Sequence, residues 1–399
     1  MQLPEEERTD RIAEAHWRRL GFGILAAAFL FNLGQGVLRP SLPLYLRHAF
    51  AANYRMVTLI PVVFGAGKWA TNLPTGYLLD RLGRRRLMIA GLIVIAACDI
   101  ASSAIVEYVM FLAARACAGA GWAMFATVAT TAMVSRAESR GRAISVLLMA
   151  ESVGLLVGSA IGGSLYIHGG PTSPLFFEAG CMVMAAGAVG WFGLPGTPTA
   201  RMVTSSGPEA LRNLGRVPGF KLMCGSNAAI AGIQTGVIVF LFPLYLAERA
   251  AISPDVVGYL IAVGVAGRLM ALWFAASIRH QHARISRLAI GLAAFGLLLG
   301  TVVILRSSVL FIVWSLLLGA AGGFVAGLPT TIIGDRVDLS RHGAAVAWLR
   351  TATDAGMLLG PLAMGQLADA LDLAVPFVVA GLISCTLAAA CYRHALATP

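Results

Sequence analysis

The stretch GYLLDRLGRRR, residues 76–86, stands between two long apolar runs of the chain. It places one acid, Asp80, and four arginines within seven residues, whereas the runs on either side carry hardly any charge. Gly83 supplies the backbone freedom that a tight turn requires. The stretch therefore indicates a short polar turn between two helices that are themselves mostly apolar.

The same alternation of apolar runs and charged islands continues along the 399 residues, of which 58% are apolar and only 12% charged. Soluble domains average about 25% charged residues. An apolar helix of about 20 residues spans the roughly 30 Å hydrocarbon core of a bilayer. We therefore predict an all-α membrane protein whose twelve transmembrane helices lie at residues 19–39, 56–79, 87–106, 108–133, 142–165, 175–194, 221–245, 255–278, 286–305, 308–333, 343–367 and 374–392.

The net charge of +11 does not indicate nucleic-acid binding, because the basic residues lie in alternate short loops. If the N-terminus is cytoplasmic, that side has 21 Lys and Arg and the opposite side has 4. The excess of basic residues on the cytoplasmic side predicts that both termini face the cytoplasm. Residues 1–16 lack the apolar core of a secretory signal peptide. We expect a protein of a bacterial inner membrane, surrounded by lipid.

Six cysteines lie inside the predicted spans, and their spacing fits neither a metal site nor a disulfide framework. We interpret them as small apolar residues. His280 and His282 lack a nearby carboxylate or cysteine set. We therefore expect no metal and no cofactor.

Several features recur 200 residues further along the chain. The segment PLYL at 43–46 returns at 243–246, and Gly67-Lys68 returns as Gly267-Arg268. Several matches at one offset predict two homologous halves. The expected parts are an N-terminal segment at 1–18, a bundle at 19–195, a polar linker at 196–218, a second bundle at 219–393 and a tail at 394–399.

The stretch at 76–86 resembles the G-x-L-a-D-R-x-G-R-R signature of the major facilitator superfamily, and span number, repeat and linker fit the same family. The resemblance implies two pseudo-symmetric six-helix bundles and a monomer that moves a small-molecule substrate by alternating access. In that family the loop is a latch that holds the cytoplasmic side shut in one state. The corresponding latch residues are Gly76, Asp80, Arg81, Gly83 and Arg84, with Arg136, Arg140 or Arg142 as basic partners.

Glycines at four-residue spacing mark two of the predicted spans and let helices approach closely. Those in span 142–165 resemble the family's antiporter motif G-x3-G-P-x2-G-G, with Ser159 in place of the proline. The resemblance associates this motif with export, and tight packing without directional meaning is the alternative. The residues are Gly154, Gly158, Gly162 and Gly163, with Gly356, Gly360 and Pro361 in span 343–367.

Charged side chains at the bilayer centre cost about 2.5–3.5 kcal/mol each, so each is a functional candidate. Glu151 and Asp354 are the predicted proton carriers, and Glu151 ranks first because Arg350 and Asp354 are four residues apart and can neutralise each other. Glu151 can instead pair with an arginine as a gate. Asp99 and Glu178 lie nearer the span ends, where we expect them to snorkel or bind water. The central charges are Arg39, Lys68, Arg115, Glu151, Arg268, Arg350 and Asp354.

Arg115-x3-Gly119-x-Gly121 resembles the family's R-x3-G-x-G motif, whose arginine is linked to proton coupling. In this family the first, fourth, seventh and tenth spans line the central cavity. The resemblance therefore implies that polar and aromatic residues of these spans contact the substrate. Each amide among them can equally make a helix-packing hydrogen bond. The predicted substrate contacts are Asn32, Gln35, Arg39, Arg115, Trp122, Asn227 and Gln234.

Five central cations against two central carboxylates are consistent with an anionic or zwitterionic substrate, and a neutral amphipathic drug stays equally open. We predict a proton-coupled antiporter that exports a small organic molecule and takes its energy from the transmembrane proton gradient. The alternative is an uptake symporter or uniporter for an organic anion or other metabolite. An enzyme is not indicated, because neither H-E-x-x-H nor G-x-S-x-G occurs, and Trp69 follows Lys68 where a phosphate loop needs Ser or Thr.

Overall fold

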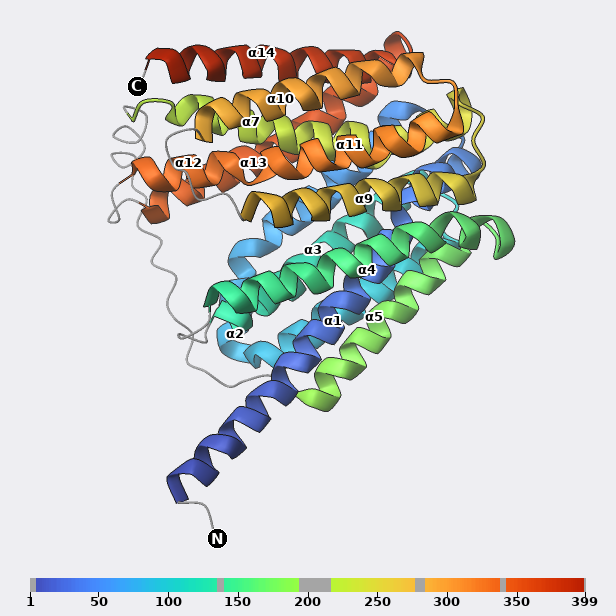
Figure 1. Ribbon diagram of the computed structural model, residues 1–399. Coiled ribbons are helices and arrows are strands. Elements are labelled where there is room, and N and C mark those ends of the chain that lie inside the picture. Colours follow the sequence, from blue (N-terminus) through green and yellow to red (C-terminus); the bar gives the residue numbers. More distant parts are fainter. Residues whose placement is uncertain (1–4, 135–139, 194–216, 277–283, 338–341, 398–399) are drawn as a thin grey trace. The chain divides into compact units, whose positions relative to one another are not determined.

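The computed structural model describes residues 5–134, 140–193, 217–276, 284–337 and 342–397, and within these ranges the regular secondary structure is all helical, with short turns between the helices (Figure 1). The prediction of an all-α fold is confirmed. The helices are α1 Glu5–Phe50, α2 Tyr54–Ala104, α3 Tyr108–Val134, α4 Arg140–His168, α5 Ser173–Phe192, α7 Phe220–Ile233, η2 Gln234–Leu241, α8 Phe242–Leu244, η3 Tyr245–Arg249, α9 Pro254–Ala276, α10 Arg284–Thr301, η4 Val302–Ile304, α11 Ser308–Ala326, α12 Leu328–Arg336, α13 His342–Ala370 and α14 Val375–Ala397.

Among the described residues, ten helical segments are long and apolar enough to cross a membrane. The other two predicted spans, 56–79 and 343–367, are helical as well and lie within α2 and α13. Span 56–79 contains Lys68, and span 343–367 contains Arg350 and Asp354. Charged residues of this kind lower the mean hydropathy of a helical segment.

The turn inside the stretch at 76–86 is confirmed at Gly83. This residue has φ 76° and ψ 159° and interrupts α2, which contains two of the predicted spans. L-residues with a side chain rarely adopt such a positive φ, whereas glycine does so at little cost. A single glycine therefore separates the two helical arms of α2.

Contacts divide the chain into two units. The first holds Met1–Leu38 and Ala66–Arg201, and the second holds Arg39–Gly65 and Met202–Pro399. The segment Arg39–Gly65 thus groups with the second unit, although the sequence repeat assigns it to the first half. The domain boundaries expected from the sequence stay a prediction.

The 200-residue repeat is visible in the backbone. Ala51 and Ala251 both have a positive φ, 45° and 52°, which is uncommon for alanine. The next amides donate back to the preceding helix, from Ala52 to the carbonyl of Leu46 at 3.3 Å and from Ile252 to that of Leu246 at 2.9 Å. Equivalent turns therefore follow the two PLYL segments.

Each unit has its own apolar core. In the first, the rings of Phe31 and Phe125 stack with centroids 4.3 Å apart. In the second, Phe242 packs on Trp314 at 5.1 Å, and the indole N–H of Trp314 donates to the carbonyl of Leu298 at 2.7 Å. Trp314 is therefore a packing residue.

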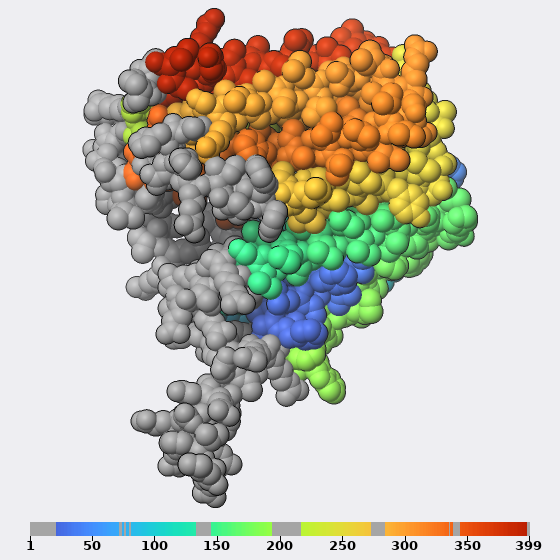
Figure 2. Space-filling view, in the orientation of Figure 1, coloured from blue at the N-terminus to red at the C-terminus, as the bar shows by residue number. Residues whose placement is uncertain are grey.

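The outward faces of the helices carry large apolar side chains as well. In the second unit α10 lies along α14 (Figure 1), and both helices form part of the face in Figure 2. Ile290 and Leu297 on α10 and Leu382 on α14 are each more than 60% exposed. Such side chains suit helices whose outer solvent is lipid.

Candidate functional site

A cavity in the second unit lies between α1, η2, α9 and α11. Its volume of about 50 Å³ has room for a few water molecules or a small charged headgroup. The π-helical segment η2 forms one wall, and π-helical turns occur often at functional sites. The lining residues are Arg39, Gln234, Ile238, Val239, Phe242, Leu260, Ile261, Gly264, Val265, Arg268, Ser315, Leu318 and Gly319.

The polar groups of this cavity are donors, set in an apolar lining. Arg39 and Arg268 bring two guanidinium groups, and no carboxylate of the described chain forms an ion pair with either. Ser315 is only 3% exposed, and its Oγ has no hydrogen-bond partner among the described residues. Gln234 adds an amide. Because buried polar groups cost free energy unless they are paired, the cavity favours an anion.

The structure brings Arg39 and Gln234 together in this cavity and places the other predicted substrate contacts elsewhere. Asn32 donates to the carbonyl of Ala28 in its own helix at 3.0 Å. Asn227 donates to Thr353 Oγ1 at 2.5 Å and to the carbonyl of Leu349 at 3.2 Å. The bond of Asn32 stays within α1 and those of Asn227 join α7 to α13, and the part of both amides in substrate binding stays a prediction.

Trp122 lies against a cation in the first unit. The ammonium group of Lys68 stands over its indole ring at 3.9 Å from the centroid. This is cation–π geometry, which favours a charged lysine in an otherwise apolar setting. The positive charge of Lys68 is thus stabilised by the Trp122 ring of α3. This helix is one of those that the family resemblance assigns to the central cavity.

A buried charge cluster lies inside the first unit. Arg115 on α3 donates from Nη2 to Oδ1 of Asp99 at 2.6 Å and to Oγ of Ser102 at 2.9 Å, both on α2. Glu178 on α5 accepts a hydrogen bond on Oε1 from Nε2 of Gln35 on α1 at 2.5 Å. Asp99 and Glu178 are 0% exposed, and Arg115 is 3% exposed. Four helices thus converge on three charged groups.

The expectation that Asp99 and Glu178 snorkel is therefore wrong, and binding of water stays a prediction. Both lie only about 7.5 Å from the nearest helix end, counted at 1.5 Å per residue, yet neighbouring helices cover them completely. Position along an apolar run does not reveal which face of the helix a residue is on. The available signal was Arg115, a buried cation that requires a carboxylate partner.

The two predicted proton carriers, Glu151 and Asp354, are less enclosed. Glu151 on α4 is half-buried, and no hydrogen bond or ion pair joins it to another described residue. Asp354 is also half-buried and Arg350 is exposed. Both are described residues, and no ion pair joins them, so the static pair that their spacing allows is not formed. The role of Glu151 and Asp354 in proton transfer stays a prediction.

The predicted latch is described only in part. Arg81 stands over the ring of Tyr77 at 4.7 Å, and Arg85 donates to the carbonyl of Gly190 on α5. Arg84 has interactions of its own. The side chains of Asp80, Arg136, Arg140 and Arg142, and the surroundings of Gly76, lie outside the described residues. The latch therefore stays a prediction.

The glycine motifs lie at close helix contacts. A Cβ on Gly36 of α1 would stand 2.6 Å from the carbonyl oxygen of Leu155 and 2.9 Å from the amide of Ser159. A Cβ on Gly236 would stand 2.8 Å from Cα of Pro361. Gly154 and Gly158 pack on α1 and Gly356 and Gly360 on α7 with equally little space, and Gly162 and Gly163 are buried.

Ser159 replaces the proline of the family motif without leaving a free polar group. Its Oγ donates to the carbonyl of Leu155 at 2.8 Å in its own helix. The same contact surface therefore exists in both repeats, with serine in one and proline in the other.

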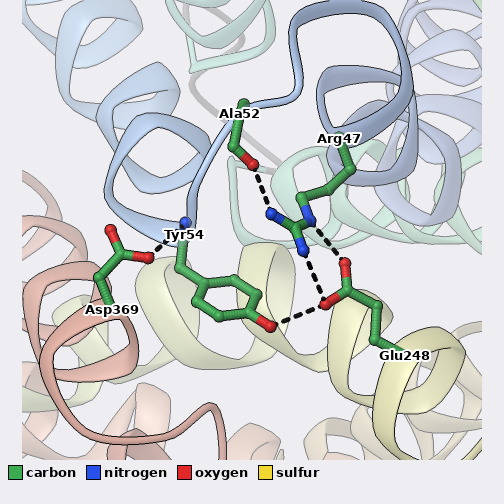
Figure 3. Close-up of polar contacts among 5 residues, drawn as sticks. All are labelled: Arg47, Ala52, Tyr54, Glu248 and Asp369. Atoms are coloured by element: carbon green, nitrogen blue, oxygen red, sulfur yellow. Dashed lines mark hydrogen bonds and ion pairs between the residues drawn. The ribbon is translucent and has the colours of Figure 1, made fainter.

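A polar network joins the ends of α1, α2, η3 and α13 within the second unit (Figure 3). Arg47 holds Glu248 with two hydrogen bonds, at 2.6 and 3.2 Å, and donates to the carbonyl of Ala52 at 2.8 Å. The hydroxyl of Tyr54 donates to the same carboxylate at 2.7 Å. Burial and the hydrogen bond with Glu248 raise the pKa of Tyr54 to about 12, so the phenol keeps its proton.

Asp369 of α13 completes the network at the start of α2. Its two carboxylate oxygens accept from the backbone amides of Tyr54 and Arg55, each at 2.8 Å. A carboxylate at a helix N-terminus is stabilised by the unpaired amides and by the helix dipole. A second ion pair, Arg249 with Asp372 at 3.4 Å, joins η3 to the turn that follows α13.

The family model described as Major Facilitator Superfamily matches residues 24–231 and 224–399, nearly the whole chain. The chain belongs to the major facilitator superfamily. It is therefore a multi-pass membrane transporter with a small-molecule substrate, and not an enzyme.

Relatives in this superfamily include transporters of different kinds. The uncharacterized MFS-type transporter YcaD of Salmonella arizonae is 26% identical over 350 residues, which cover 85% of this chain and 86% of YcaD. The synaptic vesicular amine transporter of Mus musculus is 26% identical over 341 residues, which cover 81% of this chain and 63% of that protein.

Solved structures of the same fold share less sequence. The nucleoside transporter NupG superposes with a TM-score of 0.74 at 12% identity and covers 94% of this chain and 98% of its own. A bacterial homolog to the human lysosomal transporter Spinster, solved in an inward-facing and occupied conformation, has a TM-score of 0.77 at 14% identity, with 96% and 97% covered. These structures support the major facilitator fold.

Proposed function

We propose that this superfamily member is a proton-coupled antiporter that exports a small organic anion, similar to the drug–proton antiporter branch. The observation that supports an anionic substrate is the cavity lined by Arg39, Arg268 and the unpaired hydroxyl of Ser315. Its apolar wall of Ile238, Leu260 and Leu318 suits the body of an amphipathic molecule. A carboxylate, sulfonate or phosphate headgroup fits the donors.

The same cavity disfavours a cationic substrate. Two unit charges about 5 Å apart repel each other by roughly 3 kcal/mol at an effective dielectric constant of 20. An ammonium group beside Arg39 and Arg268 meets this repulsion twice, and no carboxylate among the described residues lines the cavity to offset it. The likeness to a vesicular amine transporter therefore supports antiport as the mechanism and not an amine as the substrate.

Alternating access requires contacts that exist in one state and break in the other. We propose that the Arg47–Glu248 network is such a contact. It ties Arg47 and Tyr54, which belong to the first half by the sequence repeat, to Glu248 and Asp369 of the second half. The side chains of Arg47 and Glu248 are 35% and 29% exposed. Partly exposed ion pairs are weak enough to open in each cycle.

The proposed exchange is electrogenic. If one anion leaves for each proton that enters, two charges cross the membrane in the direction that the potential favours. Each charge contributes about 2.3 kcal/mol per 100 mV, so a membrane potential of about 100 mV alone supplies about 4.6 kcal/mol per cycle. Exchange of an amine cation for one proton moves no net charge. Sensitivity to the membrane potential therefore separates the two substrate classes.

Everted bacterial membrane vesicles that contain the protein test this proposal. Three naphthalene compounds of similar size serve as probes: naphthalenesulfonate, a naphthyl trimethylammonium ion and naphthol. We expect the sulfonate, and not the ammonium ion, to dissipate a respiration-generated pH gradient, followed with a pH-gradient dye, in these vesicles and not in empty ones. A response to the ammonium ion alone contradicts the substrate class. Uptake of the sulfonate into right-side-out vesicles supports the import alternative.

We further propose that the protein lies in a bacterial cytoplasmic membrane with both termini in the cytoplasm. The 21 to 4 ratio of basic residues supports this orientation. Reporter enzymes fused at either terminus, one active only in the cytoplasm and one active only outside it, test it directly. Activity of the external reporter at either terminus contradicts it.

A further inference from the structure

The positive and negative groups of the charge cluster in the first unit are unequal in number. It contains two carboxylates, Asp99 and Glu178, but only one cation, Arg115. With all three groups ionised it carries a net charge of −1, although the three side chains are 0 to 3% exposed. A net charge sealed away from water is expensive, and a buried carboxylate that lacks compensation binds a proton instead.

The atoms without partners show where this proton fits. Oδ1 of Asp99 and Oε1 of Glu178 already accept hydrogen bonds, from Arg115 and Gln35. Oδ2 of Asp99 and Oε2 of Glu178 are buried and have no hydrogen-bond donor among the described residues. The two carboxyl groups lie within reach of each other. Two ionised carboxylates repel at such a contact, whereas one added proton converts it into a hydrogen bond.

We propose that Asp99 and Glu178 form a proton-binding pair that holds one shared proton, with Arg115 as its fixed counter-ion. The proposal rests on the proton coupling proposed above and names the site of that coupling. It replaces Glu151 as the first-ranked proton carrier. Because the two carboxyl groups interact strongly, they titrate as a unit and the proton belongs to the pair.

The remaining groups that face the pair are neutral near pH 7 in the described part of the chain. From α1 comes the amide of Gln35, from α2 the hydroxyl of Ser102 and the thiol of Cys98, and from α5 the thiol of Cys181. The ring of Phe111 lies 5.4 Å from the guanidinium of Arg115 on the α3 side. Arg115 is therefore the one counter-charge that these contacts supply.

Gln35 connects the pair to the helix that carries the substrate site. It stands one turn before Arg39 on α1, and Arg39 lines the anion cavity. The closeness of α1 to α5 here depends on Gly34, where a Cβ would lie 3.1 Å from Cγ of Glu178. Loss of the proton leaves a buried negative charge beside this contact, which favours a rearrangement that admits water. Proton release is thereby linked to movement of α1.

Infrared spectroscopy of the purified full-length protein at pH 7 tests the pair without a substrate. The carbonyl stretch of a protonated carboxyl group reports the shared proton, and its shift in heavy water identifies it. Charge balance predicts one such band in the wild type that disappears in Glu178→Gln and in Asp99→Asn, because a single carboxylate then neutralises Arg115. It predicts that the band doubles in Arg115→Gln, because both carboxyl groups then need a proton.

The carbonyl band should disappear when either acid is removed and double when Arg115 is removed. A purely structural role of these residues predicts neither change. Glu151→Gln is the matched control and should keep the band. The proposal is overturned if the band survives in both Glu178→Gln and Asp99→Asn, or if it is lost in Glu151→Gln. If one of the two acid variants does not fold, the other together with Arg115→Gln still decides the result.

The outcome is separable from that of the proposed function. A band that follows the charge count supports the pair, even if naphthalenesulfonate never dissipates a pH gradient; in that case antiport of this anion fails and the proton site stands. A pH gradient that the sulfonate dissipates equally well in wild type and Glu178→Gln overturns the pair as the site of proton coupling and leaves antiport in place.

Discussion

Gln35 donates a hydrogen bond from Nε2 to Oε1 of Glu178 at 2.5 Å, which joins α1 to α5 inside the first unit. Gln35 is half-buried and Glu178 is fully buried. A hydrogen bond to a charged or shared carboxyl group is stronger than one between neutral groups. The contact therefore carries the proposed connection between the proton-binding pair and the helix of Arg39.

Gln35→Leu removes this donor at nearly constant volume. Hydrogen bonds to charged groups contribute about 1.5–3 kcal/mol, so we expect proton-driven efflux to fall roughly 10- to 150-fold. Binding of naphthalenesulfonate should change little, because Gln35 does not line the cavity. Efflux from proteoliposomes with and without a pH gradient measures the change.

The control for that experiment is Ser152→Ala on α4, whose hydroxyl donates only to the carbonyl of Leu148 in its own helix at 2.7 Å. It should retain gradient-driven efflux. Equal efflux from Gln35→Leu and wild type would remove the hydrogen bond from the coupling mechanism.

Arg39→Gln and Arg268→Gln each take one guanidinium from the anion cavity. Each should weaken binding of naphthalenesulfonate at least about tenfold, which corresponds to roughly 1.4 kcal/mol. The lysine variants should recover part of the affinity, since they keep the charge but lose the forked geometry. Calorimetric titration of the purified protein gives the dissociation constants.

Arg350→Gln on α13 is the matched control, because Arg350 is exposed and does not line the cavity. Its affinity for the sulfonate should stay within about twofold of wild type. A general loss of affinity in all three glutamine variants would show a nonspecific effect of net charge and contradict the cavity as the anion site.

The Arg47–Glu248 pair is testable by a charge exchange. Arg47→Glu and Glu248→Arg each place like charges together and should lower both thermal stability and transport. The double variant should recover part of each, with a coupling free energy of about 0.5–1.5 kcal/mol. Thermal unfolding of the four proteins completes the cycle, and strictly additive losses would show that the two side chains do not interact.

Gly158→Ala tests the close contact of α4 with α1. Its Cβ would collide with the carbonyl oxygen of Leu33 and stand 3.0 Å from Cα of Gly36. Forcing atoms into packed interiors costs about 1–3 kcal/mol, so the Tm should fall by several degrees. Gly187→Ala on α5 is the control, since nothing lies within 4 Å of its added Cβ. An unchanged Tm in Gly158→Ala would contradict the packing.

Local features of the fold could be predicted from the sequence because their causes are local. The turn at Gly83 follows from a glycine between charged residues, and the matching turns at Ala51 and Ala251 follow from the 200-residue repeat. Twelve helical spans were predicted, and ten pass as membrane-spanning by apolarity alone. The two others hold the charged residues Lys68, Arg350 and Asp354, which lower their hydropathy.

The candidate site could be predicted only in part. Arg39 and Gln234 were expected to bind substrate, but Ser315 was missed, because cavity lining depends on which helix faces meet. The π-helical stretch η2 also changes the angle between successive residues, so a 3.6-residue period misplaces side chains there. The partnership of Arg115 with Asp99 and Glu178 joins residues of three different helices, which periodicity cannot reveal.

Proteoliposomes loaded with naphthalenesulfonate give the most direct test of proton coupling through the Asp99–Glu178 pair. Wild-type protein should release the sulfonate faster when an inward proton gradient is imposed, and it should also exchange labelled for unlabelled sulfonate without a gradient. Glu178→Gln should keep the exchange and lose the acceleration by the gradient. Acceleration of the same size in Glu178→Gln and wild type would contradict the account.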